Sequence, residues 1–205
     1  MREVSNILGK SGAVVKNGHF VGTSGKHMSV YINKSQVMAN PKYVSKIGRL
    51  FAEKFQNKDI EAVVAPAVAG IVLSQWTAYY LSKFNKKEVV SLYTEKTKDN
   101  NQIFKRGYDF LVKNKRVLIV EDITTTGSSI KKVIRSVKKA GGRVIAASVM
   151  VNRDTKLVNS KTIRVPFSSL TILKIPSYNA SNCPLCKKGI PINSSLGHGG
   201  KFLDK

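Results

Sequence analysis

The sequence predicts an α/β fold in which helices cover both faces of a parallel sheet. One observation is that apolar runs of strand length alternate with longer amphipathic runs of helix length. A second is a strand–helix–strand unit between residues 116 and 151. Because parallel neighbouring strands need such a crossover, this unit indicates a parallel sheet, and repeated alternation places helices on both faces.

Each element is assigned from the spacing of its apolar residues. For example, Tyr43, Ile47 and Leu50 stand near helical spacing. The polar stretch 94–108 is expected to be a long loop, and the tail after Pro176 is expected to be irregular. The predicted helices cover residues 1–12, 42–57, 70–83 and 128–140, and the predicted strands cover 61–66, 88–93, 116–120 and 143–151, with further strands within 161–175.

The charge of the chain is its most unusual bulk property. Lys and Arg total 35 against 12 Asp and Glu, which gives a formal net charge of +23. Such an excess attracts polyanions, but the basic residues are scattered singly or in pairs, so a solvated basic surface with weak nonspecific nucleic-acid affinity is expected. A membrane span, a signal peptide and a disulfide framework are not indicated, and a cytoplasmic location is expected.

The residues that indicate chemistry lie at the end of one predicted strand. Residues 117–129 read VLIVEDITTTGSS: an apolar strand, two acids, a Thr/Gly/Ser loop and a helix start. Ligands of α/β sheets bind beyond the carboxyl ends of strands, and N–H groups at a helix start suit a phosphate. Gly127 lets the backbone approach the ligand closely. The alternative is a strand end with a polar turn and an N-cap serine.

The two acids decide between kinds of ligand. Glu121 and Asp122 would repel a phosphate placed beside them. They fit sugar hydroxyls, whose hydrogen bonds they can accept, or a magnesium ion that they assist. With the phosphate further along the loop, the block indicates a site for ribose and its 5′-phosphate.

This block resembles the signature with which type I phosphoribosyltransferases bind 5-phosphoribosyl-1-pyrophosphate (PRPP). It is not a nucleotide P-loop, since the Gly-Lys-Ser ending is absent. Three further segments are similar to orotate phosphoribosyltransferases, and two others recur in one bacterial and archaeal subgroup of that family. The three are residues 18–33, 65–71 and 151–154, and the two are residues 104–108 and 183–186. The resemblance runs in order from about residue 8 to residue 192.

The resemblance implies a fold, a reaction and an assembly. The fold is the type I phosphoribosyltransferase fold as one domain over residues 1–205, with a small N-terminal hood at about 1–40, a core at about 41–175 and an irregular tail at 176–205. The reaction moves ribose 5-phosphate from PRPP to orotate, with Mg²⁺ held mainly by PRPP and no direct protein ligand. The assembly is a homodimer in which loop 94–108 reaches the neighbouring subunit's site.

The resemblance also implies roles for individual residues. For PRPP, Glu121 and Asp122 would hold the ribose hydroxyls, and Val68 and Ala69 would contact the pyrophosphate through the backbone. The 5′-phosphate would be cradled by Thr124, Thr125, Thr126, Gly127, Ser128 and Ser129, and Ile123 and Lys26 are further PRPP-binding residues. For orotate, they are Tyr31, Ile32 and Thr125 on the pyrimidine and Arg153 on its carboxylate. Lys96 and Lys98 would close over the pyrophosphate, and with Asp122 they are the candidate catalytic residues.

The sequence departs from the family pattern at several positively charged positions. Many members carry lysine where Thr23 and Ala69 stand, arginine where Glu95 stands and histidine near Asn100. Lys26 and Arg106 are candidates to supply some of the missing charge.

Two further groups are interpreted as structural. His19 and His27 are expected to be surface or packing residues rather than acid–base groups. Cys183 and Cys186 have the spacing of half a zinc site, but four ligands are normal and only His198 is near them in sequence. A knuckle-like turn without metal is therefore expected.

Two other functions stay open at this point. A purine phosphoribosyltransferase would explain residues 117–129, but neither Ser24-Gly25-Lys26 nor Arg153. A non-catalytic regulator would keep the PRPP site and contact nucleic acid through the basic surface, although the chain has no helix-turn-helix extension.

Overall fold

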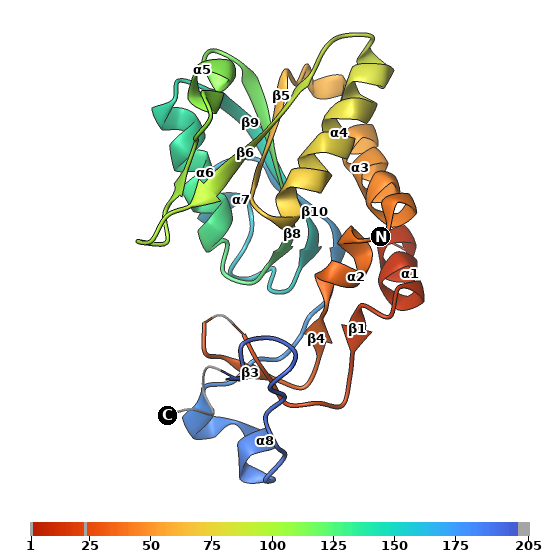
Figure 1. Cartoon of the computed structure of the whole chain (residues 1–205), viewed down its shortest axis with the longest axis vertical. Coiled ribbons are helices and arrows are strands. Elements are labelled where there is room, and N and C mark those ends of the chain that lie inside the picture. Colours follow the sequence, from red (N-terminus) through yellow and green to blue (C-terminus); the bar gives the residue numbers. More distant parts are fainter. Residues whose placement is uncertain (1, 23, 201–205) are drawn as a thin grey trace. The chain divides into compact units, whose positions relative to one another are not determined.

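The computed structural model describes residues 2–22 and 24–200 (Figure 1). Thr23 and residues 201–205 of the predicted tail lie outside the described residues. The chain forms two compact units: the first contains residues 2–4 and 38–173, and the second contains residues 5–22, 24–37 and 174–200. The second unit therefore combines the N-terminal segment with the tail. None of the described helices has the length and apolar character that a membrane span requires.

The first unit is built on a six-stranded sheet. The strand order is β10-β9-β8-β5-β6-β7, and all neighbours are parallel except β6 and β7. This sheet confirms the predicted α/β class. The elements are α3 (Pro41–Phe55), η1 (Gln56–Lys58), β5 (Ala62–Pro66), α4 (Ala69–Asn85), β6 (Val90–Lys96), β7 (Gln102–Ile103), α5 (Tyr108–Val112), β8 (Arg116–Thr124), α6 (Ser128–Lys139), β9 (Arg143–Asn152), α7 (Ser160–Ile163) and β10 (Phe167–Ile172).

Helices cover both faces of this sheet, as alternation along β5 shows. Ala62 and Val64 pack in one cluster with the apolar face of α6. Ala65 points the other way, and a Cβ added at Gly70 of α4 would lie 2.8 Å from its Cβ. Every residue of β5 is buried, as a central parallel strand covered on both faces must be.

The prediction that residues 94–108 form a loop is wrong for the first half of that stretch. Strand β6 continues to Lys96, the chain turns, and β7 pairs back with Gln102 opposite Lys96. Inside this hairpin, Oγ1 of Thr94 donates to Oε1 of Gln102 at 2.8 Å. The hairpin contacts helix α6 of the same chain, where Lys132 and Ser136 donate to the backbone oxygens of Asn100 and Gln102. The polar stretch is therefore a β-hairpin followed by α5.

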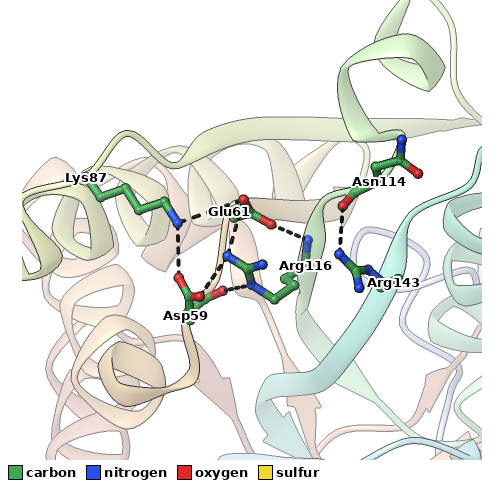
Figure 2. Close-up of polar contacts among 6 residues, drawn as sticks. All are labelled: Asp59, Glu61, Lys87, Asn114, Arg116 and Arg143. Atoms are coloured by element: carbon green, nitrogen blue, oxygen red, sulfur yellow. Dashed lines mark hydrogen bonds and ion pairs between the residues drawn. The ribbon is translucent and has the colours of Figure 1, made fainter.

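The amino-terminal edge of the sheet is held by an ion-pair network (Figure 2). Nη2 of Arg116, at the start of β8, lies 2.7 Å from Oδ2 of Asp59 and 3.3 Å from Oε1 of Glu61. Nζ of Lys87 lies 3.1 Å from Oδ1 of Asp59. A hydrogen bond from Lys87 is the main cause that lowers the pKa of Asp59, and one from the Arg116 N–H is the main cause that lowers the pKa of Glu61. This network joins the start of β8 to the segments that precede β5 and β6, at the sheet edge opposite the predicted site.

Replacing Arg116 with Met is expected to lower the melting temperature at pH 7 by about 2–4 °C, because two carboxylates lose a shared partner. Carboxyl groups with lowered folded-state pKa values stabilise the fold above their unfolded pKa values, and that contribution is lost as the pH falls through the folded values. The difference from wild type is therefore largest near neutral pH and shrinks below about pH 4. Arg143→Met is the matched control, since Arg143 is exposed and Nη2 donates only a long 3.4 Å bond to the Asn114 carbonyl. Equal losses in both variants at pH 7 would contradict the network's role.

The second unit is joined by backbone pairs between chain segments that are distant in sequence. His27 and Tyr178 exchange N–H···O bonds of 2.8 and 2.9 Å, and the N–H groups of Asn193 and His198 donate to the carbonyls of His19 and Val21. Strand β1 pairs antiparallel with β4, and β2 with β3. The elements of the second unit are β1 (Val14–Val15), β2 (Phe20–Val21), β3 (His27–Met28), β4 (Tyr31–Ile32), η2 (Ala180–Asn182) and α8 (Pro184–Lys187). Two helices, α1 (Arg2–Lys10) and α2 (Lys34–Met38), have residues in both units.

Candidate active site

Two buried acids stand at the carboxyl end of β8. Glu121 is 8% exposed and Asp122 is 4% exposed. Because successive strand residues point to opposite faces, Glu121 lies on the face of Ile119, toward α6, and Asp122 lies on the face toward α4. Oδ1 of Asp122 accepts a hydrogen bond from the N–H of Ile123. Two adjacent carboxylates buried at the carboxyl end of a strand are typical of a ligand-binding position in an α/β sheet.

The turn that follows the acids is shaped for an anion. Oγ1 of Thr124 accepts a 3.0 Å hydrogen bond from the N–H of Gly127. Gly127 has a φ of 71°, and a Cβ there would lie 2.7 Å from Cδ1 of Ile163, so only glycine fits. Helix α6 then starts, and the first N–H groups of a helix lack partners within it and favour an anion. Of the predicted PRPP-binding residues in this segment, Thr126 and Ser128 are exposed, and Ile123, Thr125 and Ser129 are partly exposed.

The turn after β5 reaches the same edge of the sheet. The N–H of Ala67 donates to the carbonyl of Thr94 at 2.8 Å, which ties this turn to β6. The peptide bond between Ala67 and Val68 is cis. Val68 is 82% exposed, and Ala69 is the first residue of α4. The structure thus brings Val68 and Ala69 to the carboxyl edge, where β5 and β8 are neighbours.

Arg153 follows β9, the other neighbour of β8. Its N–H donates to the carbonyl of Thr124 at 2.9 Å, which sets Arg153 beside the predicted phosphate turn. Burial lowers the pKa of its guanidinium from the ordinary value. A guanidinium stays charged at neutral pH, so this is a partly desolvated cation that gains from an anionic ligand.

Two residues that sequence reasoning missed shape the turn around Arg153. Oδ1 of Asn152 accepts from the N–H of Asp154 at 3.1 Å, and Oδ1 of Asp154 accepts from the N–H groups of Lys156 and Leu157. Nδ2 of Asn152 also donates to the carbonyl of Val158 at 2.9 Å. The Asn-x-Asp spacing is the signal that points to them, since both side chains favour such turns.

The β6–β7 hairpin carries the predicted loop lysines. Lys96 ends β6 and Lys98 lies in the turn, and both side chains are exposed. Glu95, which replaces an expected cation, binds Nζ of Lys105 at 3.1 Å and Nε of Arg106 at 3.2 Å. A hydrogen bond from Lys105 is the main cause that lowers the pKa of Glu95. Arg106 is therefore engaged with Glu95 rather than unpaired.

The remaining predicted ligands lie in the second unit. Nζ of Lys26 donates to Oδ1 of Asn179 at 2.6 Å. The ring of Tyr31 packs on that of Phe20, with centroids 5.5 Å apart, and Ile32 is buried. Their roles toward PRPP and orotate stay predictions.

His198, which the sequence suggests as the possible companion of Cys183 and Cys186, is the wrong histidine. Among the described residues, the side chains that gather with Cys183 and Cys186 are those of His19 and His27, not that of His198. Both histidines are buried, so the predicted surface position is wrong for them. Sequence distance hid this group, since the histidines and cysteines stand at opposite ends of the chain.

Residues 33–175 match the family model of the phosphoribosyl transferase domain, the class of protein that this fold and the β8 site define. The orotate phosphoribosyltransferase of Thermotoga maritima is 37% identical over 189 residues, which are 92% of this chain and 94% of that protein. That of Caldanaerobacter subterraneus is 37% identical over 87% of this chain and 88% of its own length. The chain belongs to the orotate phosphoribosyltransferase family.

A solved structure agrees with this assignment. The orotate phosphoribosyltransferase of Aeropyrum pernix is similar with a TM-score of 0.62 and 27% identity, covering 83% of this chain and 93% of that one. A solved structure of the Mycobacterium tuberculosis orotate phosphoribosyltransferase in complex with PRPP has a TM-score of 0.60 at 18% identity. This similarity supports the fold alone.

Proposed function

We propose that this protein transfers ribose 5-phosphate from PRPP to N1 of orotate, giving orotidine 5′-monophosphate and pyrophosphate for pyrimidine nucleotide synthesis. The observation that carries the proposal is the meeting, at one sheet edge, of a buried acid pair, a glycine-shaped anion turn and a partly buried arginine. The acids and the turn account for a phosphorylated ribose. Arg153 accounts for an acceptor base that carries a carboxylate, and the named relatives agree with that acceptor.

Different residues of this edge bind different parts of the two substrates. Glu121 and Asp122 accept hydrogen bonds from the ribose hydroxyls, and the turn of residues 124–129 donates N–H groups to the 5′-phosphate. The exposed backbone at Val68 and Ala69 contacts the pyrophosphate. The guanidinium of Arg153 pairs with the orotate carboxylate in the geometry that arginine favours. Tyr31 and Ile32 contact the pyrimidine ring.

In this proposal, stabilisation of the negative charge on the leaving pyrophosphate is the main source of the rate enhancement. As the C1–O bond breaks, the sugar becomes oxocarbenium-like and the leaving pyrophosphate gathers negative charge. Lys96 and Lys98 stabilise that charge, and closure of their hairpin keeps out water, the competing nucleophile. Pyrophosphate leaves with the electron pair of the broken C1–O bond, and N1 of orotate bonds to C1 and gives up its proton to solvent. No covalent enzyme intermediate is required.

The carboxylates at the end of β8 also fit Mg²⁺. Their oxygens are the donors that this hard cation prefers, and they are buried beside the turn that receives the phosphate. When bound with PRPP, Mg²⁺ supplies electrostatic stabilisation of the pyrophosphate. Glu121 and Asp122 are the residues that would assist it.

Turnover with orotate tests the proposal. We expect radiolabelled or absorbance-monitored orotate to be consumed with PRPP and Mg²⁺, and adenine, guanine and hypoxanthine to be left unchanged. Consumption of a purine instead would identify a purine phosphoribosyltransferase. Tight PRPP binding in calorimetry, without turnover of any base, would identify a non-catalytic PRPP-binding protein.

We also propose a homodimer in which the hairpin lysines act on the partner's site. Mixing Lys96→Ala/Lys98→Ala with Glu121→Gln/Asp122→Asn, each inactive alone, is then expected to restore activity. A hybrid dimer has one site with both wild-type parts and one site with both defects. Random exchange makes about half of the dimers hybrid, so about a quarter of wild-type activity returns if the assembly has closed two-fold symmetry.

Mass spectrometry of tagged chains measures the exchange in this experiment. Lys138→Ala/Lys139→Ala is the matched control for loss of charge, because these two exposed lysines lie in the last turn of α6. That variant is expected to keep wild-type activity by itself. Hybrids that form but stay at the mutant baseline would show that Lys96 and Lys98 serve their own subunit or are not catalytic.

A further inference from the structure

The second unit gathers four metal-ligating side chains outside the PRPP site. His27 is the first residue of β3 and His19 directly precedes β2, while Cys183 precedes α8 and Cys186 lies within it. Figure 1 labels β3 and α8. One ligand atom from each residue lies within 4.8 Å of all the others. His19, His27 and Cys183 are buried, and Cys186 closes the group at the surface.

Local structure explains how two distant segments meet at this point. In the β2–β3 pair, Val21 stands opposite His27, and His19 is two residues before Val21 on the same face. The two imidazoles are thus diagonal neighbours, with ring centroids 4.8 Å apart. The Cys-x-x-Cys spacing on the short helical turn brings both sulfurs to one side. The His27–Tyr178 backbone pair ties that tail segment to β3.

The distances are near those of a tetrahedral zinc site. With Zn–S of about 2.3 Å and Zn–N of about 2.0–2.1 Å, a sulfur and a nitrogen ligand lie about 3.5 Å apart. Sγ of Cys186 lies 3.4 Å from Nδ1 of His27 and 3.8 Å from Nε2 of His19, and Sγ of Cys183 lies 3.8 Å from Nε2 of His19. The two nitrogens are 2.6 Å apart, and binding would separate them by about 0.7 Å.

A second contact orients one of the imidazoles for binding. Nδ1 of His19 lies 2.7 Å from the carbonyl oxygen of Ile190. A carbonyl oxygen only accepts, so Nδ1 carries the proton and Nε2 offers its lone pair to the group. Metal-binding histidines usually have such a partner on the other ring nitrogen, which fixes the tautomer and the ring orientation.

We propose that His19, His27, Cys183 and Cys186 bind one Zn²⁺ ion in a closed structural site. Two thiolates balance the charge of the ion, so the largely buried group becomes neutral overall, and four protein ligands leave no open position for catalysis. The donor set of two sulfurs and two imidazoles in tetrahedral arrangement is the one that selects zinc. The ion cross-links the hairpin of β2 and β3, which contains Lys26, to the tail segment around α8 within the second unit. This proposal is independent of the reaction at the β8 edge.

Metal analysis of the full-length protein tests the proposal. We expect about one zinc per chain by mass spectrometry of protein purified without chelators. Replacing that zinc with Co²⁺ is expected to give the d–d bands of a tetrahedral site and a sulfur-to-cobalt charge-transfer band. Cys183→Ser/Cys186→Ser is expected to lose the metal and both signals. His198→Ala, which leaves the four ligands in place, is the matched control and is expected to keep them.

Several outcomes would overturn the proposal. One is a reduced wild-type protein that takes up neither Zn²⁺ nor Co²⁺ at micromolar concentrations. Another is unchanged metal content in Cys183→Ser/Cys186→Ser, which would place the ion elsewhere. A third is a Cys183–Cys186 disulfide with no bound metal, shown by thiol counting. Wild-type binding and the cobalt spectrum decide the matter even if the double variant does not fold.

Discussion

Glu121→Gln/Asp122→Asn is expected to lower kcat/KM for PRPP by about 10³-fold or more while the fold is retained. The amides keep the size of the side chains at the end of β8, but they lose the charge that accepts hydrogen bonds from the ribose and assists Mg²⁺. Turnover with orotate measures the loss, and circular dichroism checks the fold. Calorimetry with PRPP then shows whether binding is lost, as the ribose role requires.

A charge-matched control is needed because the chain is so basic. Glu88→Gln/Asp109→Asn removes two exposed carboxylates away from β8 and is expected to keep wild-type turnover. The single variants are also informative, since Glu121 and Asp122 lie on opposite faces of the strand and need not contribute equally. Normal PRPP affinity in the double variant would refute the assignment of these acids to the ribose.

Arg153→Ala is expected to raise the KM for orotate by about 30-fold or more, with PRPP affinity almost unchanged. The variant removes a charge-assisted pair from a partly dry position, and such losses cost ~2–5 kcal/mol. Steady-state kinetics with varied orotate measure the change. Uracil, which lacks the carboxylate, is expected to be used equally poorly by the variant and by wild type, so discrimination between the two bases collapses.

Lys156→Ala is the control for this variant. Lys156 is exposed in the turn that follows Arg153, and it meets Asp154 only through its backbone N–H in that turn, which alanine retains. The control is expected to leave both KM values unchanged. An unaltered KM for orotate in Arg153→Ala would place the orotate carboxylate elsewhere.

Most of the sheet could be predicted from apolar runs, but the end of β8 and the whole of β7 could not. Strand β8 was expected to end at Val120, yet it continues through both acids to Thr124. Acids are poor strand formers, so pattern reasoning stops at them, whereas pairing with β9 carries the strand onward. Strand β7 is two residues long and is held by Lys132 and Ser136 of α6, a tertiary effect that has no local signal.

The candidate site could be predicted where its residues are contiguous and not where they are dispersed. Residues 121–129 form one strand–turn–helix, so their order along the chain already indicates their arrangement. The group of His19, His27, Cys183 and Cys186 depends on pairing between the two ends of the chain, which spacing alone does not reveal. The binding of Glu95 to Lys105 and Arg106 was hidden for a related reason, because it depends on how the hairpin folds back.

The make-up of the second unit sets an order of events on the ribosome. Residues 5–37 are synthesised before residues 174–200, the segment that pairs with them, and residues 38–173 of the other unit lie between the two. The pairs His27–Tyr178, Asn193–His19 and His198–Val21 therefore cannot form until the chain has passed residue 173. Since domains generally fold as units during synthesis, the sheet is expected to form before the second unit closes. Residues 5–37 are thus open to proteases and chaperones while the sheet is folding.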